Sequence, residues 1–373
     1  MPTALARLVG LNDDEWARTW PLTAYLFLTT AGTVASKATR DALFLDRFPA
    51  VDLPYVDVAI ALLVGVAVAI YLRAHRRLTM RTLQIGTLWL CAAVCTLFWW
   101  LSRPGGDGGV LFIAIYLWVG IFGALAPVQV WTLANFVFTT REAKRAFGLI
   151  GGGAILGWIV GGFGTRLTAA WMGTQALLLL VAGSLVLSSA LVDLVWRRAG
   201  APQVKPDVSA PGLRESLRQV AASRYLRAIA FIVAFSSIAT TIAGWQFKAI
   251  AKAAIPETDA LTAYFGSFNM IAGVASLALQ VLLTGPVLRA AGVGVALFIV
   301  PVAMAGASAA VLVLGSLAAV SALKASDQVL RYSIDKSTVE LLYCRSRPPR
   351  RSAPSRSSTP SSTVPATPSA GWP

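Results

Sequence analysis

Ten apolar runs, each long enough to cross a lipid bilayer, recur along this chain of 373 residues. The hydrocarbon core of a bilayer is about 30 Å thick, and a helix needs about 20 apolar residues to span it. A transmembrane barrel would instead show short strands of alternating polarity. The sequence therefore predicts an all-α polytopic membrane protein. The predicted spans are 20–38, 54–72, 82–101, 110–137, 146–169, 173–196, 225–248, 262–284, 292–315 and 317–335.

The charge content of the chain agrees with a bilayer environment. Charged residues make up 13% of the chain and hydrophobic residues 56%, whereas a soluble domain has about 25% charged residues. Lys and Arg are concentrated in alternate loops, near 73–81, 141–145 and 197–224. Because such loops stay on the cytoplasmic side, we expect the N-terminus to be cytoplasmic.

The net charge of +15 does not indicate nucleic-acid binding. The basic residues lie mostly in these loops and in the C-terminal tail, so we expect no nucleic-acid partner. The few cysteines and the one histidine have neither disulfide nor metal-ligand spacing, and we expect no metal and no cofactor. They are Cys91, Cys95, Cys344 and His75.

The last apolar run carries charges that lipid disfavours. Lys324, Asp327 and Arg331 stand three and four residues apart, a spacing that puts all three on one face of a helix. A charge inside a membrane costs about 3 kcal/mol or more, and it is tolerated mainly where it faces a wet cavity or a partner charge. The stripe predicts a polar, mostly cationic pathway inside the membrane.

Polar residues also mark the first and seventh runs. The first ends with Lys37, Arg40 and Asp41, and the seventh ends with Gln246 and Lys248. These residues are either part of the pathway or anchors whose side chains reach the membrane surface. For Arg40 and Asp41 both interpretations stay open, whereas the deeper position of Lys37 favours the pathway.

The fourth run ends near Asn135, which is either a pathway residue or a polar residue at a helix end. The fifth run begins with a series of glycines near helical spacing. No strand precedes this series and no Lys-Ser/Thr follows it, which argues against a phosphate-binding loop. We interpret it as a face on which membrane helices pack closely. The glycines are Gly148, Gly152, Gly153, Gly157, Gly161 and Gly162.

Six spans precede a charged segment rich in Pro and Ser, and four follow it. This order is typical of a two-half transporter built from parallel repeats. The first, fourth, seventh and tenth spans then line the path, and the unusual charges fall in three of them. The expected parts are an N-terminal half at 1–196, a cytoplasmic linker at 197–224, an incomplete second half of four helices at 225–343 and a tail at 344–373.

The composition changes abruptly after Tyr343 to Arg, Ser, Thr and Pro, with no acidic residue. This segment is either a disordered tail or the product of a shifted reading frame. Loss of one base before the codon of Cys344 lets the tail be reread as Leu-Pro-Val-Pro and later as a stretch beginning Phe-Ile-Asp. We favour the frameshift, and we expect the resulting truncated chain to be inactive.

Several short motifs together resemble the ATP/ADP translocase family of bacteria and plastids. Each motif is weak alone, but the combination is specific and covers most of residues 20–343. After its Leu-Leu-Tyr motif the family sequence continues with Leu-Pro-Val-Pro and later Phe-Ile-Asp, the same motifs that the shifted frame yields. The motifs are Lys37 with Asp41-Ala-Leu, Trp131 with Ala134-Asn135, Glu142-Ala-Lys-Arg with Phe147-Gly148, Gln246-Phe-Lys248, and Leu323-Lys324 leading to Asp335-Lys336-Ser-Thr and Glu340-Leu-Leu-Tyr343.

The resemblance implies a major-facilitator-like bundle of two halves, with about ten of twelve spans present. It implies a transporter in the bacterial inner membrane, not an enzyme, that exchanges ATP, ADP or another phosphorylated anion by alternating access. Lys37, Lys248, Lys324 and Arg331 would then attract phosphate. Asp41 and Asp327 would serve as counter-ions or as gate pairs.

Two positions depart from the family pattern. Val119 stands where typical exchangers carry a glutamate, and Gly244-Trp245 stands where the family reads Asp-Tyr. The loss of two acidic groups makes the pathway more cationic. Two alternatives stay open, namely a membrane anchor or sensor that no longer transports and a proton-coupled exporter.

Overall fold

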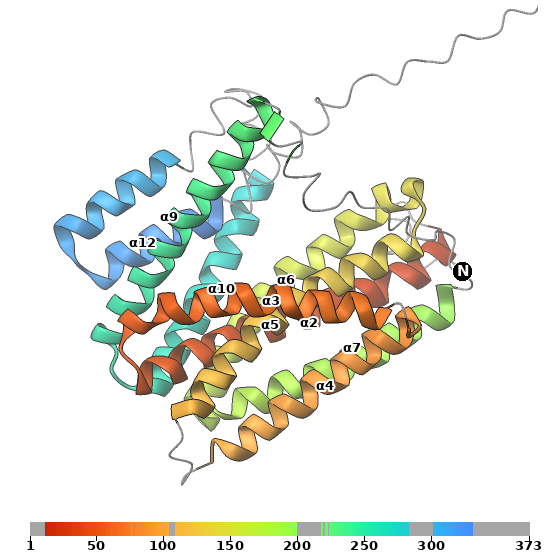
Figure 1. Cartoon of the computed structure of the whole chain (residues 1–373), viewed down its shortest axis with the longest axis horizontal. Coiled ribbons are helices and arrows are strands. Elements are labelled where there is room, and N and C mark those ends of the chain that lie inside the picture. Colours follow the sequence, from red (N-terminus) through yellow and green to blue (C-terminus); the bar gives the residue numbers. More distant parts are fainter. Residues whose placement is uncertain are drawn as a thin grey trace, which may run out of the picture.

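The computed structural model describes residues 12–75, 77–103, 109–199, 218, 221–222, 224–282 and 301–330, and each regular element in these ranges is a helix (Figure 1). In chain order the elements are α2 (Asp13–Arg47), η1 (Ala50–Asp52), α3 (Leu53–His75), α4 (Met80–Leu101), α5 (Gly109–Val137), α6 (Thr140–Met172), α7 (Ala176–Ala199), α9 (Arg224–Ala254), α10 (Thr258–Leu282), the apolar helix Pro301–Leu314 and α12 (Leu317–Leu330).

Within the described residues, six helical segments are long and apolar enough to cross a membrane, so the prediction of an all-α polytopic membrane fold is confirmed. They correspond to six of the ten predicted runs. The runs at 20–38 and 225–248 lie inside α2 and α9, the helices that carry predicted site charges. The six segments are Ala50–His75, Met80–Leu101, Gly109–Val137, Arg145–Met172, Ala176–Arg198 and Thr258–Leu282.

Several predicted features lie outside the described residues. The run at 292–315 is described only from residue 301, and the run at 317–335 only as far as residue 330. Most of the linker at 197–224 is likewise outside, as are Arg331 and the tail at 344–373 with its proposed frameshift.

The helix α2 lies at the centre of the bundle. Its 35 residues give a length of about 50 Å at 1.5 Å per residue, and it contacts α5, α6, α7 and α10. Helix α7 also packs against α4, and the two helices run side by side in Figure 1. Further along the chain, α9 and α12 contact each other, and α12 also contacts α10 (Figure 1).

Close packing of α6 depends on its glycines. A Cβ atom on Gly157 would lie 2.4 Å from the Phe27 carbonyl oxygen of α2, and one on Gly162 would lie 2.5 Å from the Met270 backbone nitrogen of α10. These distances are too short for any larger residue, so α6 is held tightly between α2 and α10. Gly148 and Gly152 have no atom within 4 Å of an added Cβ, and the packing interpretation does not apply to them.

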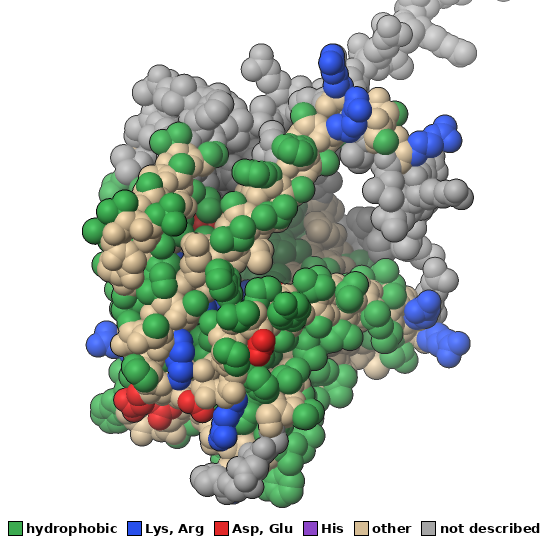
Figure 2. Space-filling model, turned by 60° about the vertical axis from the view of Figure 1, so that its left-hand side comes forward, with side chains coloured by type: hydrophobic (Ala, Val, Ile, Leu, Met, Phe, Trp, Pro, Cys, Tyr) green, Lys and Arg blue, Asp and Glu red, His purple; other side chains and the backbone are tan. Residues whose placement is uncertain are grey.

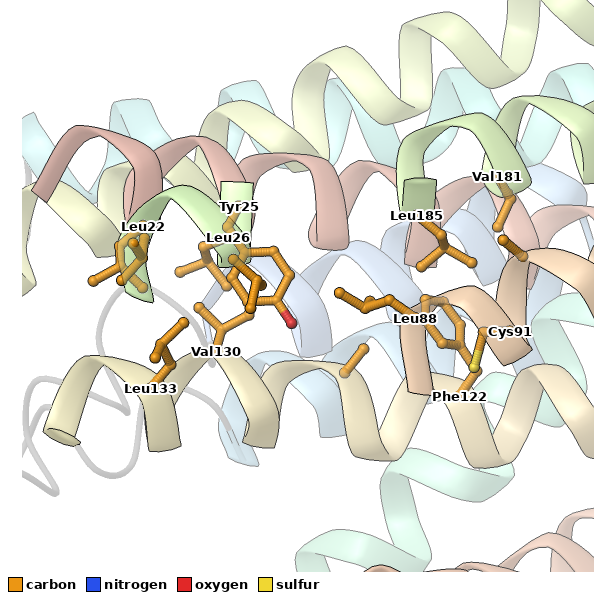
Figure 3. Packing of buried hydrophobic residues seen from close by; sticks show 14 of the residues in the cluster. Leu22, Tyr25, Leu26, Leu88, Cys91, Phe122, Val130, Leu133, Val181 and Leu185 are labelled. Carbon is orange, nitrogen blue, oxygen red and sulfur yellow. The ribbon is translucent and has the colours of Figure 1, made fainter. Parts of the chain in front are cut away.

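Two large apolar clusters, beside a smaller third one, join the described helices. The larger one joins α2, α4, α5, α6 and α7, and Figure 3 shows Leu22, Tyr25 and Leu26 of α2 gathered with Val130 and Leu133 of α5. The second joins the end of α2 to α5, α9, α10 and α12. The second cluster therefore brings the end of α2 to the helices that follow the linker.

Much of the outer surface is apolar, as expected for helices that face lipid. Hydrophobic side chains cover most of the face shown in Figure 2. On α3, Tyr55, Leu62 and Val66 are more than half exposed. These side chains have lipid rather than water as their natural solvent.

Candidate functional site

The end of α2 supplies the first charges of the site. Arg40 Nε lies 3.3 Å from Asp41 Oδ1, and both side chains are more than four-fifths buried. Neither of these two atoms makes a hydrogen bond within the described residues. The pair is therefore held by charge alone and keeps hydrogen-bonding capacity for another group.

A lysine of α9 completes this cluster. Lys248 Nζ lies 3.1 Å from Asp41 Oδ1 and donates a hydrogen bond of 3.1 Å to the Tyr116 hydroxyl of α5. That hydroxyl lies 3.1 Å from Asp57 Oδ1 of α3, and the Arg40 guanidinium stacks 4.4 Å from the centre of the Tyr116 ring. Helices α2, α3, α5 and α9 thus contribute to one set of contacting polar groups.

A second charged pair lies between α9 and α12. Lys324 Nζ is 3.4 Å from Asp327 Oδ2, three residues further along the same helix. The Asp327 carboxylate, 4% exposed, also accepts a hydrogen bond of 3.1 Å from the Thr240 hydroxyl of α9. A Cβ added to Gly244 would lie 3.6 Å from Lys324 Nζ. The stripe predicted on α12 therefore faces α9.

Lys37 is close enough to both sets of charges to interact with each. Its side chain is exposed although Ser36 and Ala38 beside it are buried, and its Cε lies 3.5 Å from where a Cβ of Gly123 would be. The charges of Lys248 and Lys324 both act on it. Among the described residues no ion pair or hydrogen bond is found for Lys37. We infer that Lys37 faces solvent inside the bundle.

The site is cationic overall. Four cations, Lys37, Arg40, Lys248 and Lys324, face three carboxylates, Asp41, Asp57 and Asp327, which leaves a charge of +1 among the described groups. Lys37 lies ten residues before the last residue of α2, about 15 Å along the helix. An excess of positive charge at such depth is costly unless it has a ligand or a wet cavity.

Not all of the predicted site residues lie in this cluster. Asn135 is exposed, and it lies twelve residues beyond Gly123 on α5, about 18 Å along the helix. Gln246 is half-buried on α9. Val119, one of the two departures from the family pattern, is buried in an apolar cluster with Leu43 and Ile115.

Sequence reasoning missed Asp57 and Tyr116. A signal for Asp57 was present, because a carboxylate inside the predicted run at 54–72 is unusual. No signal pointed to Tyr116, since a tyrosine in an apolar helix is ordinary. Only the packing of α5 against α2 and α3 shows that its hydroxyl meets two charged groups.

Other ion pairs lie near the first turns of α2 and α6, away from this cluster. Arg145 Nη2 is 2.6 Å from Glu15 Oε1, and Arg18 Nη2 is 2.8 Å from Glu142 Oε1. Burial opposes ionisation of Glu142, but hydrogen bonds from Thr139 and Arg18 outweigh it and lower the pKa of the carboxyl. These pairs tie α2 to α6 within the predicted N-terminal half.

Comparison with known proteins identifies a transporter family. The model of the TLC ATP/ADP transporter family matches residues 109–329. Two relatives from Arabidopsis thaliana, the chloroplastic ADP,ATP carrier proteins 2 and 1, are each 26% identical over 212 residues. The match covers 51% of this chain and 33% of each carrier, so the chain spans about a third of the length of these relatives.

A solved structure is also similar. It is a bacterial homologue of the human lysosomal transporter Spinster, in an inward-facing and unoccupied conformation, with a TM-score of 0.47 and 14% identity. The alignment covers 92% of this chain and 80% of that one. The family match extends over more than half of the chain and names a transporter, which confirms that the protein is not an enzyme. This chain belongs to the TLC ATP/ADP transporter family.

Proposed function

We propose that the protein exchanges nucleotides, or another phosphorylated anion, across the bacterial inner membrane by alternating access. The observation that carries the proposal is the excess of cations around Lys37, in a protein of the TLC ATP/ADP transporter family. The ADP,ATP carriers among its relatives support a nucleotide as the substrate. In this proposal the chain crosses the membrane many times with its N-terminus in the cytoplasm.

The contacts suggest how an anion would be bound. Lys37 offers three N–H donors that no described group accepts, and a phosphate oxygen is a strong acceptor for an ammonium group. Arg40 and Lys248 now share the single oxygen Oδ1 of Asp41. A phosphate group would compete with Asp41 for these two cations. When no substrate is bound, the Asp41 carboxylate balances the charges of Arg40 and Lys248 in place of the phosphate.

The second pair would respond in the same way. Lys324 is held by Asp327 on its own helix, while Asp327 is held by Thr240 of α9. A phosphate that draws Lys324 toward Lys37 would lengthen the Lys324–Asp327 contact. The Asp327 carboxylate would keep its hydrogen bond from Thr240. Substrate binding would therefore change contacts at the junction of α2, α9 and α12. We propose that these changes favour movement of the two halves against each other.

Exchange of labelled ATP, ADP and phosphate into liposomes tests the proposal. The chain is assayed both as the 373-residue protein and with the reading frame restored after Tyr343, and sequencing of the gene through codon 344 tests the frameshift itself. We expect exchange by the restored protein only. A stop codon soon after codon 344 in the other frame would overturn the frameshift.

Site variants test the role of the cations. Each lost charge-assisted hydrogen bond is worth about 1.5–3 kcal/mol, so Lys37→Ala and Lys324→Ala should each lower affinity for the anion about 10- to 100-fold. Arg141→Ala removes an exposed cation outside the site and serves as the control. The proposal fails if no anion is exchanged or if both site variants exchange like the wild type. Binding without exchange by the restored protein would favour a sensor instead.

A further inference from the structure

The Tyr116 hydroxyl links a carboxylate of α3 to a cation of α9. It lies 3.1 Å from Asp57 Oδ1 and 3.1 Å from Lys248 Nζ. An ammonium group has hydrogens but no lone pair, so the hydroxyl must accept from Lys248. Its own hydrogen is then directed to Asp57. The direction of both hydrogen bonds follows from chemistry alone.

The ring of Tyr116 is packed against two side chains. The residue is fully buried, its ring packs 4.9 Å from that of Phe44, and the Arg40 guanidinium lies 4.4 Å from its centre. A rigid ring leaves the hydroxyl one position. Lys248 is therefore held at a defined point by two groups, the Tyr116 hydroxyl and the Asp41 carboxylate.

Lys248 donates one of its three N–H groups to the Tyr116 hydroxyl and is paired by charge with Asp41, which leaves N–H donors for a ligand. Asp57 in turn makes its one hydrogen bond within the described residues to Tyr116. Its charge reaches Lys248 through the hydroxyl, since both bonds are charge-assisted and polarise each other. The positive charge of Lys248 is thus balanced directly by Asp41 and, through the Tyr116 hydroxyl, by Asp57.

We propose that Asp57 and Tyr116 determine substrate specificity by setting the position and the charge balance of Lys248. The proposal rests on the proposed function, because it concerns the same anion site. With Asp57 present, the described site has a net charge of +1; without it, the charge is +2. Asp57 therefore limits how strongly the site favours anions of high charge, such as ATP, over anions of lower charge, such as ADP.

The hydroxyl and the carboxylate have separable effects. Tyr116→Phe removes the link without altering net charge, so affinity for every anion should fall by a similar factor, about tenfold for one lost charge-assisted hydrogen bond. Asp57→Asn adds one unit of positive charge, which should raise the ratio of ATP affinity to ADP affinity about five- to tenfold. A purely structural role would not change that ratio.

The first experiment tests the link without any ligand. The detergent-solubilised chain is treated with acetic anhydride, and the acetylation of Lys248 is measured by mass spectrometry relative to Lys252. An amine released from its acceptors reacts faster, so Tyr116→Phe and Asp57→Asn should both raise this ratio severalfold. Tyr55→Phe, which removes an exposed hydroxyl on α3, should leave it unchanged. If the acetylation ratio of Lys248 to Lys252 is unchanged in both Tyr116→Phe and Asp57→Asn, the proposal is overturned.

The second experiment measures binding of ATP, ADP and inorganic phosphate by equilibrium dialysis, with the wild type and the variants each produced with the reading frame restored after Tyr343. Asp57→Asn should shift the ATP-to-ADP ratio as stated, and Tyr116→Phe should keep the wild-type ratio. Asp52→Asn is the matched control, because the Asp52 carboxylate of η1 makes no hydrogen bond or ion pair with the described residues Asp57, Tyr116 and Lys248. A wild-type ratio in Asp57→Asn overturns the role in specificity.

The two experiments separate the possible failures. If the wild-type protein binds none of the three anions, both the proposed function and the role in specificity are overturned. In that case the acetylation result still decides whether Tyr116 holds Lys248. If the wild type binds anions but Asp57→Asn keeps the wild-type ratio of ATP affinity to ADP affinity, the proposed function stands. The role of Asp57 and Tyr116 in specificity then fails.

Discussion

Two sets of charges among the described residues of α2 and its neighbours differ in their balance. Near the first turns of α2 and α6, two cations face two carboxylates at 2.6 and 2.8 Å. Near the end of α2, four cations face three carboxylates drawn from four helices. The first set joins helices of the predicted N-terminal half. The second reaches across to α9 and α12.

The difference separates two uses of charge in a membrane protein. A balanced pair stabilises one arrangement of helices, because each charge has a partner in that arrangement. An unbalanced set keeps one cation, Lys37, without a partner among the described residues, and an anion can supply what is missing. The comparison predicts that variants in the first set change stability alone, whereas variants in the second change stability in a way that anions can reverse.

Asp41→Asn should have the largest effect. It removes the carboxylate shared by Arg40 and Lys248, and breaking a buried pair in this way costs about 3–5 kcal/mol because charge is left uncompensated. An added anion can replace the carboxylate, so ATP or phosphate should raise the midpoint of thermal unfolding more in the variant than in the wild type. Unfolding of the detergent-solubilised protein with and without each anion measures both effects.

The isosteric nature of this change makes the result easy to interpret. Asn keeps the volume of Asp, so packing loss cannot explain a fall in stability. Asp52→Asn provides the matched control, since it removes a carboxylate outside both sets. Destabilisation of Asp41→Asn that no anion reverses would place the site among the balanced, structural pairs and would break the comparison.

Arg145→Ala should destabilise the protein by a smaller amount. It strands Glu15, whose side chain is 6% exposed, and an unpaired buried acceptor costs about 1–3 kcal/mol. Glu15 keeps a hydrogen bond from the Asn12 backbone, which limits the loss. Here anions should give no rescue beyond that seen in the wild type, and Arg141→Ala is the control. Rescue of Arg145→Ala by ATP or phosphate would contradict the assignment of this pair to structure.

Gly244→Asp should convert part of the cationic set into a balanced one. Because a Cβ at this position lies 3.6 Å from Lys324 Nζ, the new carboxylate would pair with Lys324 across α9 and α12. We expect affinity for ATP to fall about tenfold, equivalent to about 1.4 kcal/mol. Gly244→Ala, whose Cβ is in ordinary van der Waals contact, should bind like the wild type. Equal affinity in the two variants would show that Lys324 does not contact the anion.

Helices and charges of this fold were predictable from sequence to different degrees. Hydropathy located the apolar part of each span but not the ends of the helices, since helical backbone continues into the aqueous region. The run predicted at 20–38 thus lies within α2, which extends from Asp13 to Arg47. Spacing alone placed Lys324 and Asp327 on one face, and the structure has them in contact.

Contacts between helices were beyond sequence reasoning. Nothing local to Asp41 indicates that its partner is Lys248, more than 200 residues further along the chain, because the pairing depends on how α2 and α9 approach each other. The interpretation of Arg40 and Asp41 as surface anchors was open for the same reason. Their burial together with Lys248 favours the pathway interpretation, and their role in binding stays a prediction.

The smallest expected effect concerns pH and the Arg18–Glu142 pair. The hydrogen bonds from Thr139 and Arg18 lower the pKa of Glu142 below its ordinary value of 4.5, so the unfolded chain binds a proton more readily than the folded one. The carboxylate therefore stabilises the fold at neutral pH, and this contribution is lost as the pH falls below 4.5 through the lowered pKa. Because water reaches the pair, the contribution is at most about 1 kcal/mol.

Glu142→Gln tests this by removing the titrating group while keeping its shape. The variant should be slightly less stable than the wild type at about pH 7, and the two unfolding midpoints should converge as the pH falls toward about 3. Added ATP should shift both proteins equally, because Glu142 lies outside the cationic set. A difference that persists at low pH would mean that Glu142 stabilises α6 through its shape and hydrogen bonds to Thr139 rather than through its charge. A difference that ATP removes would mean that the two sets of charges on α2 are coupled, and that the helix transmits the state of the site to its own first turn.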